Sequence, residues 1–244
     1  AEALRSPLST GNRATRDSLE ALLRRQAPEG TRPTPVTQRV KQVVGDGLRR
    51  GAMPQATRVA DLMAKTKSGP SSSRANYMAT LIVERLTGVR EEGFTNAAMI
   101  WGVDTEPQAR AAYEFLTDAT VIEEGFVLHQ AILDFGASPD GLVGDVGLLE
   151  IKCPQTAAHL DVLLSGEVPG KYVTQMQAQM ACTGRAWCDF VSFDPRMPGE
   201  MQLFVKRVHR DEVFIAAMEG EIAAFLAELA QKLDALRDRY QVAA

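Results

Sequence analysis

The sequence has little cysteine, no long apolar run and no excess of positive charge, and each shortage narrows the kinds of protein it can encode. Its three cysteines, Cys153, Cys182 and Cys188, are an odd number without a Cys-x-x-Cys pair. This argues against a zinc ribbon or an iron–sulfur cluster and fits a reducing compartment. No apolar run approaches the roughly 20 residues that cross a membrane, so we expect no membrane partner. The first residues lack an apolar stretch followed by a small-residue cleavage site, so we expect no secretion.

The charge balance is slightly acidic. The 244 residues include 27 Lys and Arg against 31 Asp and Glu, a formal net charge of -4. The chain is therefore no general basic coat for nucleic acid, and any nucleic-acid binding must use basic residues gathered on one surface or in a channel. With 45% hydrophobic and 24% charged residues, the composition is that of a globular protein with room for a sizeable core.

The chain divides into an extension and one domain. Residues 1–35 are rich in Ser, Thr, Arg and Pro, and we expect a flexible or helical N-terminal extension there. Residues 36–244 are expected to form a single domain. The first part of this domain, residues 36–88, is basic and has a helical pattern. The last helix of this part should bury Tyr77 and Val83 and end near Gly88.

The rest of the chain alternates helical and strand-like segments. Helices are expected at 96–115, at 171–182 and from Asp211 onward, where apolar residues recur at helical spacing. Strands are expected at 121–129, 132–137, 147–153, 187–193 and 201–208. This order predicts an α/β fold with a central mixed sheet flanked by helices.

The most informative residues are Asp140, in a Pro-Asp-Gly turn, and the Glu150-Ile151-Lys152 strand segment that follows. Side chains alternate along a strand, so Glu150 and Lys152 project to one face while Ile151 points into the core. Two carboxylates at one edge repel each other unless a cation neutralises them. Mg²⁺ prefers oxygen ligands, which the Asp140 and Glu150 carboxylates and the Ile151 backbone carbonyl would supply.

This group of residues can be interpreted as a catalytic metal centre or as the surface of an ordinary hairpin. A metal ion that activates water, beside the Lys152 ammonium, would provide the nucleophile and the charge stabilisation that phosphodiester hydrolysis needs. A Glu-x-Lys pair alone is common on the solvent-exposed face of a hairpin. The Pro-Asp-Gly turn at hairpin distance upstream favours the metal centre over the hairpin surface.

The segment Pro139-Asp140 with Glu150-Ile151-Lys152 resembles the PD-(D/E)XK nuclease signature. The surrounding Ser-Pro-Asp-Gly-Leu, Leu-Glu-Ile-Lys-Cys-Pro and Phe-Asp-Pro-Arg-Met segments are similar to the phage lambda exonuclease and viral-type recombination exonuclease family. The resemblance covers about four-fifths of the chain, from near Gly45 to the C-terminus. It implies a restriction-endonuclease-like core.

The resemblance also implies further active-site residues. Trp101-Gly102 followed by Glu106 resembles the family helix that presents a glutamate to the metal site, where Glu106 would hold a second metal or its waters. Tyr172, Gln175 and Gln177 resemble the helix that approaches the scissile phosphate. Gln179 lies one helical turn beyond Gln175, so at least two polar side chains of this helix face the site.

A binding site for a terminal 5′-phosphate is implied at Leu48-Arg49-Arg50-Gly51. Arginine suits this role because its planar fork binds phosphate through two hydrogen bonds. We assign it to Arg49 rather than Arg50, with Ser138 and Thr57 supplying hydroxyl groups. The segment departs from the family pattern, because the aromatic residue before the arginine is missing and a one-residue shift would place Ala56 where we expect Thr57.

Lys67, in the same basic part of the chain, is also expected to contact DNA. The resemblance as a whole implies an exonuclease that uses Mg²⁺, or Mn²⁺ in its place. It would degrade double-stranded DNA ends in the 5′→3′ direction and leave a 3′ overhang. It also implies a homotrimeric ring, a single-strand annealing partner, and a phage or prophage protein in the bacterial cytoplasm.

Two other functions remain open from the sequence. One is a nuclease of the same fold that cuts internally or with another polarity. The other is a DNA-binding or assembly module without activity, against which the intact Asp140, Glu150 and Lys152 argue.

Overall fold

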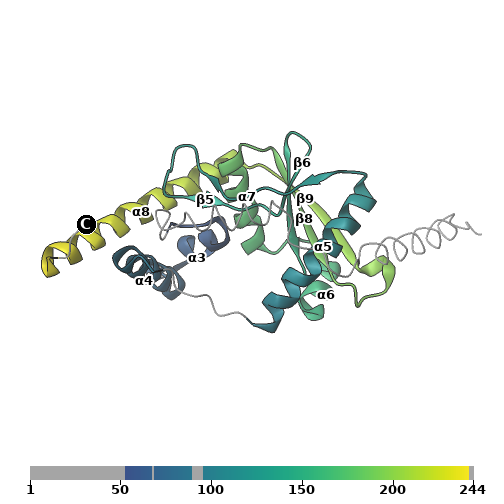
Figure 1. Cartoon of the computed structure of the whole chain (residues 1–244), viewed down its shortest axis with the longest axis horizontal. Coiled ribbons are helices and arrows are strands. Elements are labelled where there is room, and N and C mark those ends of the chain that lie inside the picture. Colours follow the sequence, from purple (N-terminus) through teal and green to yellow (C-terminus); the bar gives the residue numbers. More distant parts are fainter. Residues whose placement is uncertain (1–52, 68, 90–95, 242–244) are drawn as a thin grey trace, which may run out of the picture.

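The computed structural model describes residues 53–67, 69–89 and 96–241 (Figure 1). The expected extension at 1–35 and the expected phosphate ligand Arg49 lie outside the described residues. Everything below concerns the described part of the chain.

A five-stranded mixed sheet forms the centre of the fold, in the order β3-β6-β7-β8-β9. Its strands are β3 (Val121–Ile122), β6 (Gly141–Val143), β7 (Gly147–Lys152), β8 (Trp187–Phe193) and β9 (Leu203–His209). Only β7 and β8 run parallel, with Glu150 opposite Phe190 and Lys152 opposite Ser192. Two small antiparallel pairs lie outside this sheet: β1 (Lys65–Thr66) with β2 (Gly69–Pro70), and β4 (Val127–Leu128) with β5 (Gly136–Ala137).

Helices α5 (Ala97–Thr117), α6 (Thr156–Ser165) and α7 (Gly170–Thr183) pack against the sheet (Figure 1). Helices α3 (Val59–Met63), α4 (Ser72–Thr87) and α8 (Glu212–Tyr240) pack against one another to one side of it. Short 3-10 turns η2 (Ala56–Arg58) and η3 (Gly199–Met201) complete the described elements. The predicted α/β fold with a central mixed sheet flanked by helices is confirmed.

Strand β7 divides the core into two parts because its side chains alternate. Leu148 faces a large cluster that includes residues of α3, α4, α7 and α8. Leu149 and Ile151 face a smaller cluster formed with α5. Ile151 is therefore in the core, as predicted, and the intervening Glu150 points toward the α7 side.

Local signals explain most of the helix boundaries. The side chains of Asn96 and Asp211 accept hydrogen bonds from backbone N–H groups three residues on, at the starts of α5 and α8. Helix α4 ends at Gly88, whose φ of 68° is a left-handed conformation that glycine adopts without strain. The predicted ends of these helices are confirmed to within a few residues.

Other expectations need correction. Val83 is 56% exposed, because it lies on the side of α4 opposite to the buried Tyr77 and Leu81. The single strand expected at 121–129 is two short strands that belong to different sheets. Strand β6 and helix α6 were not predicted. No helix in the described ranges has the length and apolar character needed to span a membrane.

Candidate active site

The Asp140 turn is tied to β7 by two hydrogen bonds. The Asp140 N–H donates to the Leu149 carbonyl (3.2 Å), and the Asp140 Oδ2 accepts from the Ile151 N–H (2.7 Å). Because β6 pairs antiparallel with β7 directly after this turn, the carboxylate is held beside the strand that carries Glu150. The hairpin therefore brings together two carboxylates that are ten positions apart in the sequence.

Glu150 is fully buried, and three side chains contact its carboxylate. Its Oε1 accepts a hydrogen bond from Gln175 Nε2 (2.7 Å), and its Oε2 accepts one from Gln179 Nε2 (2.6 Å). Lys152 Nζ forms an ion pair with the same carboxylate. Gln175 and Gln179 are one turn apart on α7, so a single helix face holds both oxygens of Glu150.

Burial raises the pKa values of the three acids of this site. Burial, and then the nearby Asp140 carboxylate, raise the pKa of Glu150 to about 7. The same two causes raise the pKa of Glu106 above its ordinary value. Burial also raises the pKa of Asp140, against the opposing effect of Lys152. Burial acts to lower the pKa of Lys152, but the Glu150 and Asp140 carboxylates raise it overall, so Lys152 stays protonated.

Glu106 lies on α5, which packs against β7. It is half-buried and paired with Arg110 one turn later, at 2.8 Å. Arg110 also pairs with Glu123, which precedes β4. The Asp140 carboxylate adds to the effect of burial in raising the pKa of Glu106.

The donor chemistry fits a hard divalent cation. Within the described ranges, no three His, Cys, Asp or Glu side chains are gathered closely enough to hold a metal ion by themselves. Two carboxylates and the Ile151 carbonyl nevertheless offer oxygen ligands of the kind that Mg²⁺ takes, with water completing the set. A cation here would also offset the repulsion from Asp140 that adds to burial in raising the pKa values of Glu106 and Glu150.

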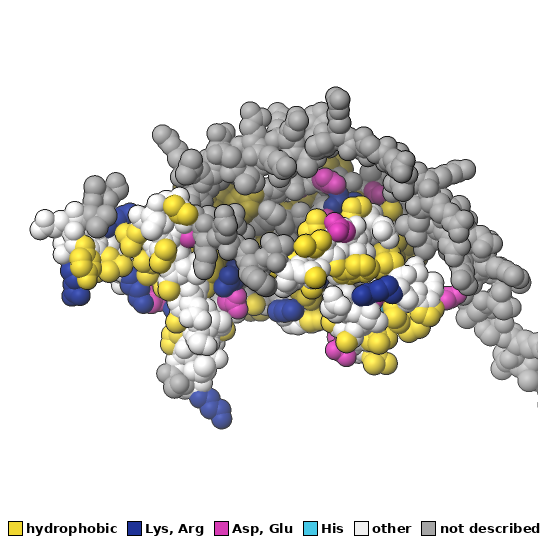
Figure 2. Space-filling view, turned by 60° about the horizontal axis from the view of Figure 1, so that its bottom comes forward, with side chains coloured by type: hydrophobic (Ala, Val, Ile, Leu, Met, Phe, Trp, Pro, Cys, Tyr) yellow, Lys and Arg dark blue, Asp and Glu magenta, His cyan; other side chains and the backbone are white. Residues whose placement is uncertain are grey.

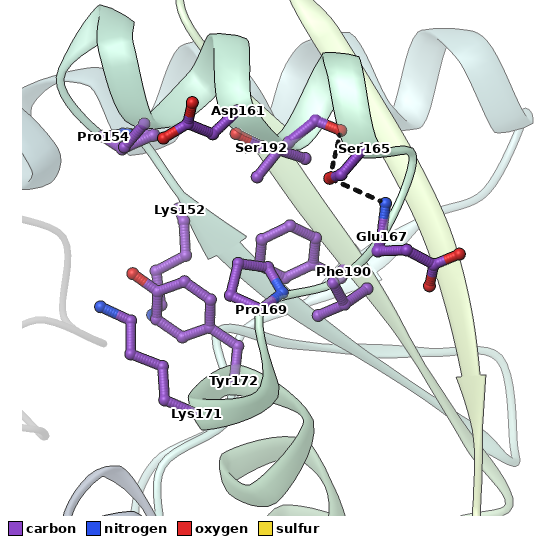
Figure 3. Close-up of a pocket in the computed structure, with 13 residues that line it drawn as sticks. Lys152, Pro154, Asp161, Ser165, Glu167, Pro169, Lys171, Tyr172, Phe190 and Ser192 are labelled. Atoms are coloured by element: carbon purple, nitrogen blue, oxygen red, sulfur yellow. Dashed lines mark hydrogen bonds between the residues drawn. The ribbon is translucent and has the colours of Figure 1, made fainter.

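Tyr172 lies at the start of α7, on the same side of the sheet as Lys152. Its ring stacks on Phe190 with the ring centres 5.5 Å apart, and Lys152 Nζ lies 5.4 Å from the Tyr172 ring centre. A cavity opens beside these residues (Figure 3). Lys171, which the sequence analysis did not identify, also lines this cavity.

Gln177 is placed away from the site. Its side-chain amide donates to the His209 carbonyl (2.8 Å) and its carbonyl oxygen accepts from the Asp211 N–H (3.0 Å). The side chain is buried, and it lies about 200° around α7 from Gln175. Gln177 thus joins α7 to the start of α8, and the prediction that it contacts DNA is replaced by this structural role.

Ser138 and Thr57 are exposed residues on neighbouring segments. Gln55 and Gly136 form a parallel bridge, so Thr57 and Ser138 each lie two residues beyond paired positions. The Ser138 carbonyl accepts a hydrogen bond from Gln179 (3.4 Å), which places this segment at the Gln179 end of the site. Lys67 is exposed in the turn between β1 and β2.

The sheet, the Asp140 turn and the Glu150–Lys152 pair define a nuclease of the restriction-endonuclease-like class. Residues 46–186, more than half of the chain, match the model of the YqaJ-like viral recombinase domain. The chain belongs to this family. The predicted resemblance to viral-type recombination exonucleases, and the prediction of an enzyme of the nuclease class, are confirmed.

Solved structures agree with this assignment. The chain is 50% identical to an alkaline exonuclease, LHK-Exo, from Laribacter hongkongensis, over 79% of this chain and 95% of that one, with a TM-score of 0.74. A structure of LHK-Exo in complex with dAMP matches at 49% identity and a TM-score of 0.75, over 80% of this chain and 96% of that one. A phage-related exonuclease from Haemophilus somnus shares the fold at 13% identity and a TM-score of 0.60, over 76% and 97% of the two chains. No curated protein sequence matches the chain.

Proposed function

We propose that the protein is a Mg²⁺-dependent 5′→3′ exonuclease that degrades one strand of linear double-stranded DNA and leaves a 3′ overhang for recombination by strand annealing. The observation that carries this proposal is the buried Glu150 carboxylate, held by two glutamines and Lys152 next to Asp140. The 50% identity to an alkaline exonuclease supports the exonuclease part of this proposal.

The metal would be held by the Asp140 and Glu150 carboxylates and the Ile151 carbonyl. Glu106 would hold a second ion or its waters, and Mn²⁺ would substitute because it accepts the same ligands. Nucleases of this family generally need a divalent metal. When bound, the ion supplies Lewis acidity: it lowers the pKa of a water molecule and neutralises negative charge on the phosphate.

The side chains of this site have separate tasks. Lys152 keeps its positive charge and stabilises the charge that develops on the phosphate oxygens. Gln175 and Gln179 fix the orientation of the Glu150 carboxylate, since each donates to a different oxygen. The Ile151 N–H fixes Asp140 in the same way. A site whose groups are already oriented needs little rearrangement on reaching the transition state.

The DNA end would be recognised beside this centre. Arg49, with the hydroxyl groups of Thr57 and Ser138, would bind the terminal 5′-phosphate, and Tyr172 and Lys67 would contact the strand. Arg49→Ala should then strongly reduce degradation from phosphorylated ends. An endonuclease of the same fold would tolerate that change.

The family assignment also supports an assembly and a setting. We propose a homotrimeric ring through which DNA passes, a single-strand annealing protein as the partner that takes up the 3′ strand, and action in the bacterial cytoplasm on behalf of a phage or prophage. Basic residues gathered in a channel would reconcile DNA binding with the net charge of -4.

The decisive experiment uses a linear duplex with one 5′-phosphorylated end, labelled at each end in turn. We expect Mg²⁺-dependent loss of the 5′ label from the phosphorylated end as mononucleotides, while the 3′ label of the same end stays on a long strand. Loss of the 3′ label first would reverse the polarity, and cutting of a closed circular duplex would indicate an endonuclease. Undiminished turnover in excess chelator would exclude the metal mechanism.

A further inference from the structure

The cavity beside Lys152 has a volume of about 280 Å³ and lies at the N-terminal end of α7. Lys152, Lys171 and Tyr172 lie at one end, while Ser165 and Glu167, from the end of α6 and the loop after it, lie at the other (Figure 3). Pro169 and Phe190 contribute apolar surface between them. Mixed apolar walls with a few polar groups are typical of small-ligand subsites.

Lys171 supplies an ammonium group that the catalytic arrangement does not use. Its side chain is exposed, its Nζ lies 4.7 Å from the Tyr172 ring centre, and no ion pair of Lys171 is found among the described residues. Glu167, an acid on the opposite wall, is instead paired with Lys206 at 2.7 Å. Lys152 is already paired with Glu150, so the charge available to an anion at this end of the cavity is that of Lys171, and a phosphate is the anion this enzyme class handles.

The position of the cavity along α7 determines which phosphate of the DNA strand it can bind. Gln179, whose amide contacts the Ser138 carbonyl, lies eight residues after Lys171, about 12 Å further along the helix. Glu150 accepts hydrogen bonds from Gln175 and Gln179 and thus lies between the two ends. One nucleotide advances about 3.4 Å along a duplex strand, so the two ends of α7 meet different nucleotides.

We infer that this cavity is the subsite for the next nucleotide of the strand being degraded, on the side of the scissile phosphate away from Ser138. Lys171 binds the phosphate that follows the scissile one, and Tyr172 and the apolar wall hold the sugar and base. This inference rests on the proposed function, because it takes the terminal 5′-phosphate to lie at the Ser138 side.

Two variants test the subsite in different ways. Lys171→Ala removes the charge, and Ala158→Phe narrows the cavity from its exposed α6 wall without changing any charge. Lys232→Ala, which removes a lysine paired with Glu228 on α8, is the matched control. The KM for a 5′-phosphorylated linear duplex is measured at several salt concentrations, together with inhibition by dAMP and the melting temperature of each variant.

We expect Lys171→Ala to raise the KM about three- to tenfold and to reduce the slope of log KM against log salt concentration by about 0.7 to 0.9, the value for one lost phosphate contact. Ala158→Phe should raise the KM and keep the slope. Inhibition by dAMP should stay at its wild-type value in both. An unchanged KM in both variants would overturn the subsite. A change in dAMP inhibition with no change in KM would also overturn it, because the cavity would then hold the released nucleotide.

The wild-type protein distinguishes failure of the subsite from failure of the proposed function. Wild-type cleavage combined with unaffected variants rejects the subsite alone. A wild-type protein that degrades no DNA under these conditions rejects the proposed function and the subsite with it.

Discussion

Lys152 is the ion-pair partner of the buried Glu150 and, in the proposed mechanism, also the cation beside the phosphate, so one substitution alters both roles. We expect Asp140→Ala and Lys152→Ala each to lower the cleavage rate by at least about 10²- to 10³-fold, while duplex binding survives. The check is the single-turnover rate together with the Kd of the same duplex. Full activity in either variant would refute the assigned centre.

The stability of these variants should differ. Lys152→Ala leaves the fully buried Glu150 without its ion-pair partner, which costs up to about 3 to 5 kcal/mol of unfolding free energy. Asp140→Ala removes a carboxylate that itself raises the pKa of Glu150, so it should fold well. Asp140→Ala therefore remains informative even where Lys152→Ala fails to fold.

Asp194, at the end of β8, gives the clearest dependence of stability on pH. Burial acts to raise its pKa, but hydrogen bonds from Arg196 and from the Thr156 hydroxyl outweigh it and lower the pKa to about 2. The usual value is 3.8, so the folded state binds this proton more weakly than the unfolded state. The resulting stabilisation, about 2 kcal/mol, is complete above pH 3.8 and is lost as the pH falls through 2.

The comparison of wild type with Asp194→Asn measures this contribution. Urea unfolding should show the variant less stable by about 2 kcal/mol at pH 6, and the gap should narrow steadily between pH 4 and pH 2. A difference in unfolding free energy that stays constant over this range would mean that the charge of Asp194 contributes nothing to stability and that only the packing of its side chain matters.

Helix α5 carries Glu106, and its attachment to the sheet should therefore tune the metal site. Tyr113, two turns after Glu106, is buried and donates a hydrogen bond to Asp189 on β8 (2.8 Å), which Arg207 also holds. Tyr113→Phe should cost about 1 kcal/mol of unfolding free energy. It should also raise the Mg²⁺ concentration for half-maximal activity by roughly threefold, because a looser helix positions Glu106 less well.

Tyr77→Phe is the matched control for this change. Tyr77 is also buried and accepts a backbone hydrogen bond from Gln55, but it lies on α4. Both variants should lose similar stability, measured by urea unfolding, whereas only Tyr113→Phe should alter the Mg²⁺ dependence of activity and of the melting temperature. An equal change in both would assign the effect to general stability.

The elements that could be predicted are those with strong local signals. Alternation in β7 placed Glu150, Ile151 and Lys152 on their correct faces, and apolar residues at helical spacing predicted α5 and α8. Helix α6 escaped prediction because no side chain caps its start and its apolar residues follow no single face, as the 85% exposure of Leu164 shows. Strand β6 has three residues, and its pairing with β7, not its own sequence, defines it.

The site was predictable in composition but not in every orientation. The helical repeat predicts Gln175 and Gln179 on one face of α7, and both side chains donate hydrogen bonds to Glu150. The same repeat places Gln177 on the other side, where tertiary contacts with the start of α8 use both ends of its amide. Lys171 carried no sequence signal beyond its position before Tyr172, since only the fold creates the cavity that it lines.

At the scale of the whole molecule, the described residues on the face seen in Figure 2 form no uniform basic patch. Figure 2 shows one face of the protein, on which Lys and Arg side chains lie among acidic ones. A single 26.6 kDa chain with a net charge of -4 would leave DNA readily at physiological salt, because few phosphate contacts act at once. An assembly that surrounds the duplex would instead keep it bound between cleavage steps.

Assembly and processivity should therefore rise and fall together. We expect sedimentation equilibrium to give three times the chain mass, and a preloaded enzyme challenged with excess unlabelled duplex to continue degrading its first substrate over many nucleotides. Dilution below the dissociation constant of the trimer should shorten the stretch of DNA degraded per binding event. The initial cleavage rate should fall less, because each chain carries its own Asp140 and Glu150. A monomer that is equally processive would show that tight contacts within one chain, not closure around DNA, retain the substrate.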